Sequence, residues 1–118
     1  MIIFCGHGKY GEAMKHSLEM IAGEQENIKS IDFTMDMAVG DILTQYNEAI
    51  QTRQSDEEVL ILCDIPGGSP ANAAFLAKKY NENVRVATGL CLAMALSIAM
   101  GESFENALTN AKEAIQEI

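Results

Sequence analysis

Short apolar runs alternate with longer amphipathic segments along the chain. Four runs rich in Ile, Val, Leu or Phe have the length and composition of buried strands, and they cover residues 2–5, 28–33, 59–63 and 84–87. Apolar residues at helical spacing predict helices over residues 11–22, 40–53, 69–79, 91–100 and 103–118. Strands that alternate with helices form βαβ units. The pattern therefore predicts an α/β fold, a three-layer sandwich with a mainly parallel four-stranded sheet and helices on both faces.

The ends of these segments carry local signals for helix boundaries. Gly23 follows the first predicted helix, where a residue free to take positive φ is favoured. Ser69 and Pro70 form a helix start, with the serine hydroxyl as the cap and the proline at the first helical position. The last predicted helix carries one apolar stripe, made by Phe104, Leu108, Ala111, Ile115 and Ile118.

Length, charge and cysteine usage narrow the class of protein. A chain of 118 residues fits one domain, residues 1–118, which can bury a core without metal or disulfide support. The net charge of −9, with scattered basic residues, argues against a nucleic-acid partner. Cys5, Cys63 and Cys91 lie in or beside apolar segments without metal-ligand spacing, which indicates core residues in a reducing compartment. With no signal peptide and no apolar stretch near the length of a membrane span, a cytoplasmic protein is expected.

The topology brings one histidine and one aspartate together. In a parallel sheet ligands bind at the carboxyl ends of the strands, where the strand order reverses. With the order 2-1-3-4, the first and third strands are neighbours at that point, and they run into His7 and Asp64. A carboxylate that accepts the proton of one imidazole nitrogen fixes the tautomer and leaves the other nitrogen as a nucleophile. Such a histidine can attack a phosphoryl group.

A glycine-rich turn follows Asp64 at the start of the third predicted helix. The backbone N–H groups of Gly67, Gly68 and Ser69 would form an anion cradle there, which suits a chain with few cations. Each feature has a plainer interpretation when taken alone. A double glycine also makes a tight strand-to-helix turn, an aspartate before glycines often caps a turn, and a histidine between glycines is often only an exposed loop residue.

Taken together, the motifs resemble the IIA domains of the mannose-type (mannose/fructose/sorbose) bacterial phosphoenolpyruvate-dependent sugar phosphotransferase system. The resemblance covers nearly the whole chain and rests on several motifs in the same order, namely Gly6-His7-Gly8, Gly23-Glu24-Gln25-Glu26-Asn27, Ile31-Asp32-Phe33, and Asp64 with Gly67-Gly68-Ser69-Pro70-Ala71-Asn72.

The resemblance implies a phosphotransferase component that acts as a phosphocarrier. His7 would accept a phosphoryl group from the phosphohistidine of HPr and pass it to a IIB domain, while Asp64 orients His7 and Ser69 lies in the phosphate-binding turn. It also implies a homodimer and contact with the membrane only through the IIC/IID transporter. The predicted four-stranded sheet has room for an added edge strand. No metal or organic cofactor is implied.

Two segments depart from the family pattern. Pro66 stands where an aromatic residue often precedes the double glycine, and residues 89–94 read Gly-Leu-Cys-Leu-Ala-Met where Gly-x-Asn-Leu-Pro-Met is common. These differences are expected to affect the choice of partner or sugar.

Three other functions are open to a chain of this pattern. A IIA-like regulatory module would sense phosphorylation without feeding a transporter, and the phosphocarrier subunit of dihydroxyacetone kinase has a similar fold and a histidine after its first strand. The turn from Gly67 to Asn72 favours the sugar-transport branch. A receiver-like domain needs an acidic cluster after its first strand, where this chain has Gly6-His7.

Overall fold

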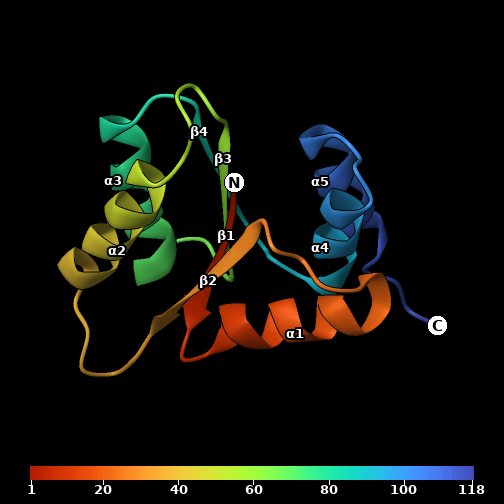
Figure 1. The fold of residues 1–118 in the computed structure, drawn as a ribbon. Coiled ribbons are helices and arrows are strands. Elements are labelled where there is room, and N and C mark those ends of the chain that lie inside the picture. The colour runs from red at the N-terminus through yellow and green to blue at the C-terminus, as the bar shows by residue number, and fades with distance from the viewer.

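Four parallel strands form the sheet of the computed structural model, which describes residues 1–118 (Figure 1). They are β1 (Ile2–His7), β2 (Ile28–Phe33), β3 (Val59–Cys63) and β4 (Val84–Thr88). Their order is β2-β1-β3-β4, and all three neighbouring pairs are parallel. The predicted sheet and its strand order are confirmed.

Five helices cover the two faces of the sheet. They are α1 (Tyr10–Ala22), α2 (Val39–Gln51), α3 (Ser69–Tyr80), α4 (Leu92–Ala99) and α5 (Phe104–Glu113). Helices α2 and α3 lie on one face, whereas α1, α4 and α5 lie on the other (Figure 1). The three-layer α/β sandwich expected from the sequence is therefore the observed fold.

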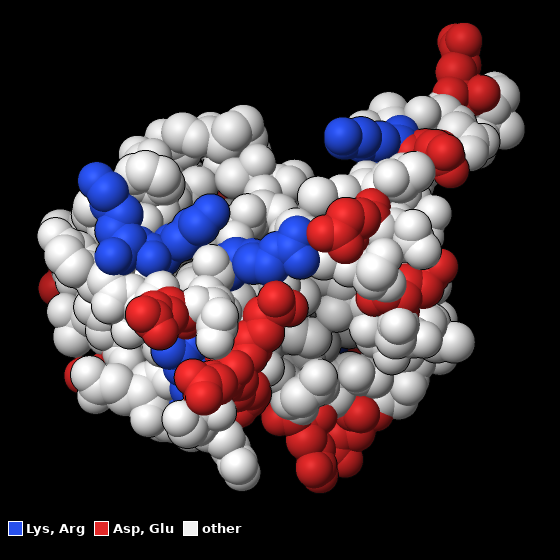
Figure 2. Space-filling view, turned by 90° about the horizontal axis from the view of Figure 1, so that it is seen from above, with Lys and Arg blue, Asp and Glu red and all other residues white.

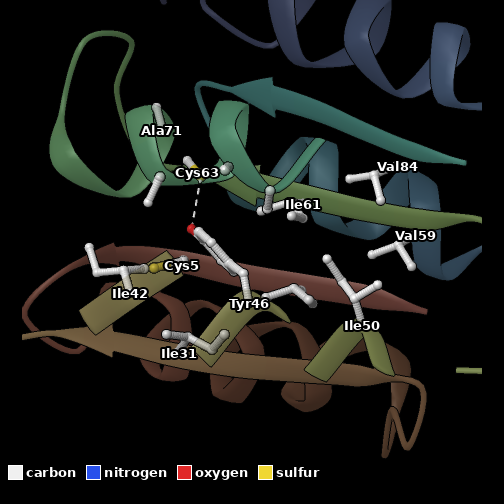
Figure 3. Packing of buried hydrophobic residues seen from close by; sticks show 14 residues of the cluster. Cys5, Ile31, Ile42, Tyr46, Ile50, Val59, Ile61, Cys63, Ala71 and Val84 are labelled. Atoms are coloured by element: carbon white, nitrogen blue, oxygen red, sulfur yellow. Dashed lines mark hydrogen bonds between the residues drawn. The ribbon is translucent and has the colours of Figure 1, made fainter. Parts of the chain in front are cut away.

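Each face of the sheet has its own apolar core, because successive side chains of a strand point to opposite faces. Ile3 and Cys5 of β1 contribute to the core under α2 and α3, and Ile2 and Phe4 contribute to the core under α1, α4 and α5. Figure 3 shows the first of these cores, with Tyr46 of α2 at its centre. Cores on both faces explain why the central strands β1 and β3 are almost wholly buried.

Strand β1 extends two residues past its apolar run. Gly6 and His7 continue the pairing with Asp32 and Phe33 of β2, so the backbone ladder runs on after the last buried side chain. Helix α1 then turns back closely over the strand. A Cβ atom on Gly11 would lie 2.5 Å from the carbonyl oxygen of Phe4, so only glycine permits this approach.

The last helix is shorter than its apolar stripe predicts. Helix α5 ends at Glu113, and Ile115 and Ile118 are fully or almost fully exposed. Ala107 and Ala111 are its buried residues, and residues 112–118 are all exposed. A short helix gains most of its stability from packing, so the predicted continuation to residue 118 is wrong.

The end of the sheet at which the strands begin carries charges of both signs. Figure 2 looks onto this end and shows a band of Lys and Arg flanked by Asp and Glu. Arg53 donates hydrogen bonds to the carbonyl oxygens of Glu57 and Glu82, and the amino group of Met1 lies 2.7 Å from a carboxylate oxygen of Glu57. These contacts join the starts of β1, β3 and β4. No helix combines the length and hydropathy needed to cross a membrane.

Candidate functional site

His7 and Asp64 lie side by side at the carboxyl ends of β1 and β3, the two central strands. The ring Nδ1 of His7 is 2.7 Å from Oδ2 of Asp64, and the backbone amide of His7 donates to the same oxygen at 2.9 Å. The histidine side chain is 51% exposed, whereas the aspartate side chain is 10% exposed. The structure thus brings together the two residues that topology predicted to meet, with the imidazole open to solvent and its partner covered.

The surroundings of Asp64 keep its carboxyl group ionised. Burial raises the pKa of this carboxyl, but hydrogen bonds from the amide and ring of His7 and from the amide of Ile65 outweigh it, so that its pKa is lowered. An ionised carboxylate only accepts hydrogen bonds. Nδ1 of His7 must therefore carry the proton, and Nε2 carries the free lone pair.

The imidazole ring of His7 is held on two further sides. The ring of Phe33 meets it edge to face, with centroids 5.6 Å apart and an interplanar angle of 77°. On another side, a Cβ atom placed on Gly68 would lie 3.0 Å from Cε1 of His7. Sequence reasoning did not assign Phe33 to the site, although the register of the parallel pair, which sets Phe33 opposite His7, could have indicated it.

Gly67, Gly68 and Ser69 form the turn from β3 into α3. Gly67 has a φ of 76°, which favours glycine, and Gly68 is the N-cap residue of α3. Ser69 is the first helical residue and its hydroxyl makes no capping hydrogen bond, so the predicted serine cap is wrong. The reason is a shift of one residue, because the first intrahelical hydrogen bond runs from the amide of Asn72 to the carbonyl of Gly68.

The backbone amides of this turn are free to bind a ligand. Those of Gly67, Gly68, Ser69 and Ala71 donate none of the hydrogen bonds within the protein. Free amides at a helix N-terminus point out along the helix axis and attract anions. Since Gly68 lies against the ring of His7, these donors are next to the imidazole.

Tyr10 joins the site to the loop after β4, which the sequence did not reveal. Its hydroxyl donates to the carbonyl oxygen of Leu90 at 2.5 Å, and burial, together with the charges of Asp64 and Cys91, raises the pKa of this phenol. Gly6 gives the tyrosine room, because a Cβ atom there would lie 2.7 Å from Cβ of Tyr10. The half-buried Cys91, at a position where the chain departs from the family pattern, is therefore close to the site.

The one cavity of the protein does not have His7 or Asp64 among its lining residues. It has a volume of about 560 Å³, and its lining residues are Lys9, Glu12, Ala13, Lys15, His16, Glu19 and Ser30. No group of three or more His, Cys, Asp or Glu side chains is arranged to hold a metal ion. The candidate site is thus an open surface, which another protein can reach more readily than it could hold a small molecule.

An exposed histidine, fixed by a buried carboxylate at the switch point of a parallel sheet, is the central feature of this α/β protein. The model of the EIIA-man family, described as the PTS system fructose IIA component, matches residues 1–116. The chain belongs to this family, the mannose-type IIA components of the sugar phosphotransferase system. The resemblance seen in the sequence is confirmed.

Individual relatives agree with the family match. The fructose-specific EIIA component of Bacillus subtilis is 32% identical over 97 residues, which are 82% of this chain and 66% of that protein. The sorbose-specific EIIA component of Klebsiella pneumoniae is 35% identical over 81% of this chain and 70% of its own length. The match to the mannose-specific EIIAB component of Escherichia coli K12, at 32% identity, spans 84% of this chain and 31% of that protein. The chain thus spans about two thirds of the length of these two EIIA components and about a third of the length of the EIIAB component.

Solved structures show the same architecture over the whole chain. The mannose/sorbose specific IIA subunit from Enterococcus faecalis superimposes with a TM-score of 0.89 at 26% identity, covering 99% of this chain and 92% of that one. The EIIA component from Streptococcus agalactiae gives a TM-score of 0.88, also at 26% identity, covering 98% and 95%. The fold and the coarse role, a IIA component of a sugar phosphotransferase system, are therefore shared.

Proposed function

We propose that this protein is a phosphocarrier that accepts a phosphoryl group on Nε2 of His7 from the phosphohistidine of HPr and transfers it to a IIB domain. The observation that carries the proposal is the 2.7 Å contact between Nδ1 of His7 and Oδ2 of Asp64. It leaves Nε2 with its lone pair on a ring that is half exposed. An incoming phosphoprotein can reach this nitrogen.

The transfer step needs no proton to leave His7. The lone pair of Nε2 forms the new N–P bond, and the N–P bond of the donor phosphohistidine breaks with its electron pair returning to the donor imidazole. The His7 ring becomes positively charged while Nδ1–H stays bonded to Asp64. A carboxylate at 2.7 Å stabilises this charge, so Asp64 both orients the ring and favours the phosphorylated state. Transfer to the IIB domain is the same step in reverse.

The turn at the start of α3 would stabilise the charge of the phosphoryl group. Gly67, Gly68 and Ser69 offer free amides beside the imidazole, and amides fixed in advance stabilise developing negative charge without reorganisation. This arrangement needs no nearby lysine or arginine. It is consistent with a chain of net charge −9 that must meet two other proteins.

The family membership supports a proposal for the wider setting of the protein. We place the protein in the cytoplasm as a homodimer, with HPr as donor, the IIB domain as acceptor, and the IIC/IID transporter as its indirect link to the membrane. Relatives are named for fructose, sorbose and mannose. In this scheme the partners of His7 are proteins, and the sugar is bound by the transporter.

The proposal is tested by intact-mass spectrometry after incubation with phosphoenolpyruvate, enzyme I and HPr. His16→Ala is a matched control, because His16 is the other histidine of the chain and lies on α1. The parental protein and His16→Ala should each gain one acid-labile phosphoryl group, and His7→Ala should gain none while staying folded. No added mass with active donor proteins, or a phosphoryl group retained by His7→Ala, would contradict the proposal.

A further inference from the structure

We propose that Tyr46 is a positioning residue for the phosphate-binding turn, with its buried hydroxyl group holding the first turn of α3 against the end of β3. The inference rests on the proposed function and adds a residue to it. Tyr46 lies on α2, in the apolar core behind the site. It acts through the backbone and touches no transferred group.

The tyrosine hydroxyl joins the two segments that flank the site loop. It lies 3.5 Å from Sγ of Cys63 (Figure 3). The same hydroxyl donates to the carbonyl oxygen of Pro70 at 3.0 Å. Cys63 is the residue directly before Asp64, and Pro70 directly follows Ser69. The loop that carries both the orienting carboxylate and the free amides is therefore held at its two ends by one oxygen atom.

The contact with Pro70 acts on a peptide unit of the anion cradle. The carbonyl of Pro70 and the N–H of Ala71 belong to one planar peptide group, so fixing one fixes the other. The amide of Ala71 donates no hydrogen bond within the protein, and in a helix it points toward the N-terminus, where Gly68 lies against His7. A hydrogen bond accepted by the carbonyl also polarises the N–H of the same peptide, which makes it a stronger donor.

Packing alone does not account for a tyrosine at this position. Tyr46 is fully buried among Ile, Val and Ala side chains, where a phenylalanine ring would fill the same space without a polar atom. A buried hydroxyl costs free energy unless it is hydrogen-bonded. Burial and the neighbouring thiols of Cys63 and Cys5 raise the pKa of Tyr46, so the group stays protonated and remains a donor.

The first test compares Tyr46→Phe with Tyr80→Phe, whose ring lies at the far end of α3 and is 75% exposed. Phosphoryl transfer from phospho-HPr is followed by quenched-flow mass spectrometry. For Tyr46→Phe the rate at saturating donor should fall roughly tenfold, because the cradle is misplaced, while KM stays parental. Tyr80→Phe should behave as the parental protein. The inference is overturned if the transfer rate of Tyr46→Phe stays within about twofold of the parental rate. It is also overturned if the decrease in rate equals the decrease in the fraction of folded protein measured by circular dichroism.

A second measurement needs no change at Tyr46. In protein labelled with carbon-13 at tyrosine Cζ, phosphorylation of His7 should shift the Tyr46 signal and leave that of Tyr80 in place. The three tyrosine signals are assigned from Tyr10→Phe and Tyr80→Phe, with Tyr46 as the third. An unmoved Tyr46 signal would overturn the inference even if Tyr46→Phe failed to fold.

Failure of the proposed function gives a different result. If active donor proteins leave the parental protein unphosphorylated, the phosphocarrier role is wrong, and the cradle is then titrated with inorganic phosphate while the amide signals of Gly68, Ser69 and Ala71 are recorded. A response that is roughly tenfold weaker in Tyr46→Phe supports the positioning role. Equal responses in both proteins, or none in either, contradict it.

Discussion

Replacing Gly68 by alanine tests whether the start of α3 sets the position of the His7 ring. The new Cβ would lie 3.0 Å from Cε1 of His7 and 3.3 Å from Cγ1 of Ile65, whereas carbon atoms in contact prefer about 3.5–4.0 Å. Gly68 has φ −79° and ψ 164°, which alanine adopts without strain. The perturbation is therefore a local push on the imidazole of about 0.5–1 Å.

A push of that size along the contact with Asp64 would lengthen its 2.7 Å to about 3.2–3.7 Å, at or beyond the upper limit of ordinary hydrogen-bond lengths. A hydrogen bond to a charged group contributes about 1.5–3 kcal/mol, and each ~1.4 kcal/mol changes a rate about tenfold. The transfer rate from phospho-HPr, measured by quenched flow, should fall by about 10- to 100-fold in Gly68→Ala.

Gly67→Ala is the matched control for Gly68→Ala. A Cβ there meets nothing within 4 Å, but the residue has a φ of 76°. Backbone strain in the folded state should therefore lower the free energy of unfolding of Gly67→Ala by about 1–2 kcal/mol. The reasoning would be refuted if Gly68→Ala transferred the phosphoryl group at the parental rate. It would also be refuted if Gly68→Ala and Gly67→Ala lost the same amount of transfer rate and of folding stability.

Three further predictions concern single side chains of the site. The pKa of the Asp64 carboxyl is lowered in the folded protein, so its contribution to stability is present above the unfolded pKa of about 4 and is lost as the pH falls through the lower folded pKa. The free energy of unfolding of Asp64→Asn, measured in urea, should therefore depend less on pH below about pH 4 than that of the parental protein. Identical pH profiles for the two proteins would contradict this. Phe33→Leu removes an edge-to-face contact worth about 0.5–1.5 kcal/mol, so transfer should slow by a few fold, and an unchanged rate would show that the contact does not hold the ring. Ser69→Ala should change the free energy of unfolding by less than the ~1 kcal/mol typical of a lost N-cap, because the Ser69 hydroxyl caps nothing. A decrease of ~1 kcal/mol or more in chemical denaturation would show that Ser69 is the N-cap after all.

The meeting of His7 and Asp64 was predictable from the sequence because it depends on topology. Short buried strands that alternate with helices permit few sheet orders, and polar residues that follow two neighbouring parallel strands must meet at one edge. The same reasoning placed the glycine turn beside them. These features depend on chain order and hydropathy, which the sequence carries directly.

Side-chain contacts across the fold were not predictable in this way. The contact of Phe33 with His7 depends on the register of β1 and β2, and that of Tyr10 with Leu90 joins residues eighty positions apart. Periodicity also shows which face of a helix is apolar but not whether another element covers it. The sequence therefore places Ile115 in an apolar stripe, whereas the structure leaves it exposed.

The measurement that tests the central claim most directly is NMR of the phosphorylated protein labelled with nitrogen-15 at histidine. The account predicts scalar coupling of phosphorus to Nε2 of His7, and a protonated Nδ1 whose hydrogen-bonded signal is lost in Asp64→Ala. Coupling to Nδ1 of His7, or to either nitrogen of His16, would contradict it.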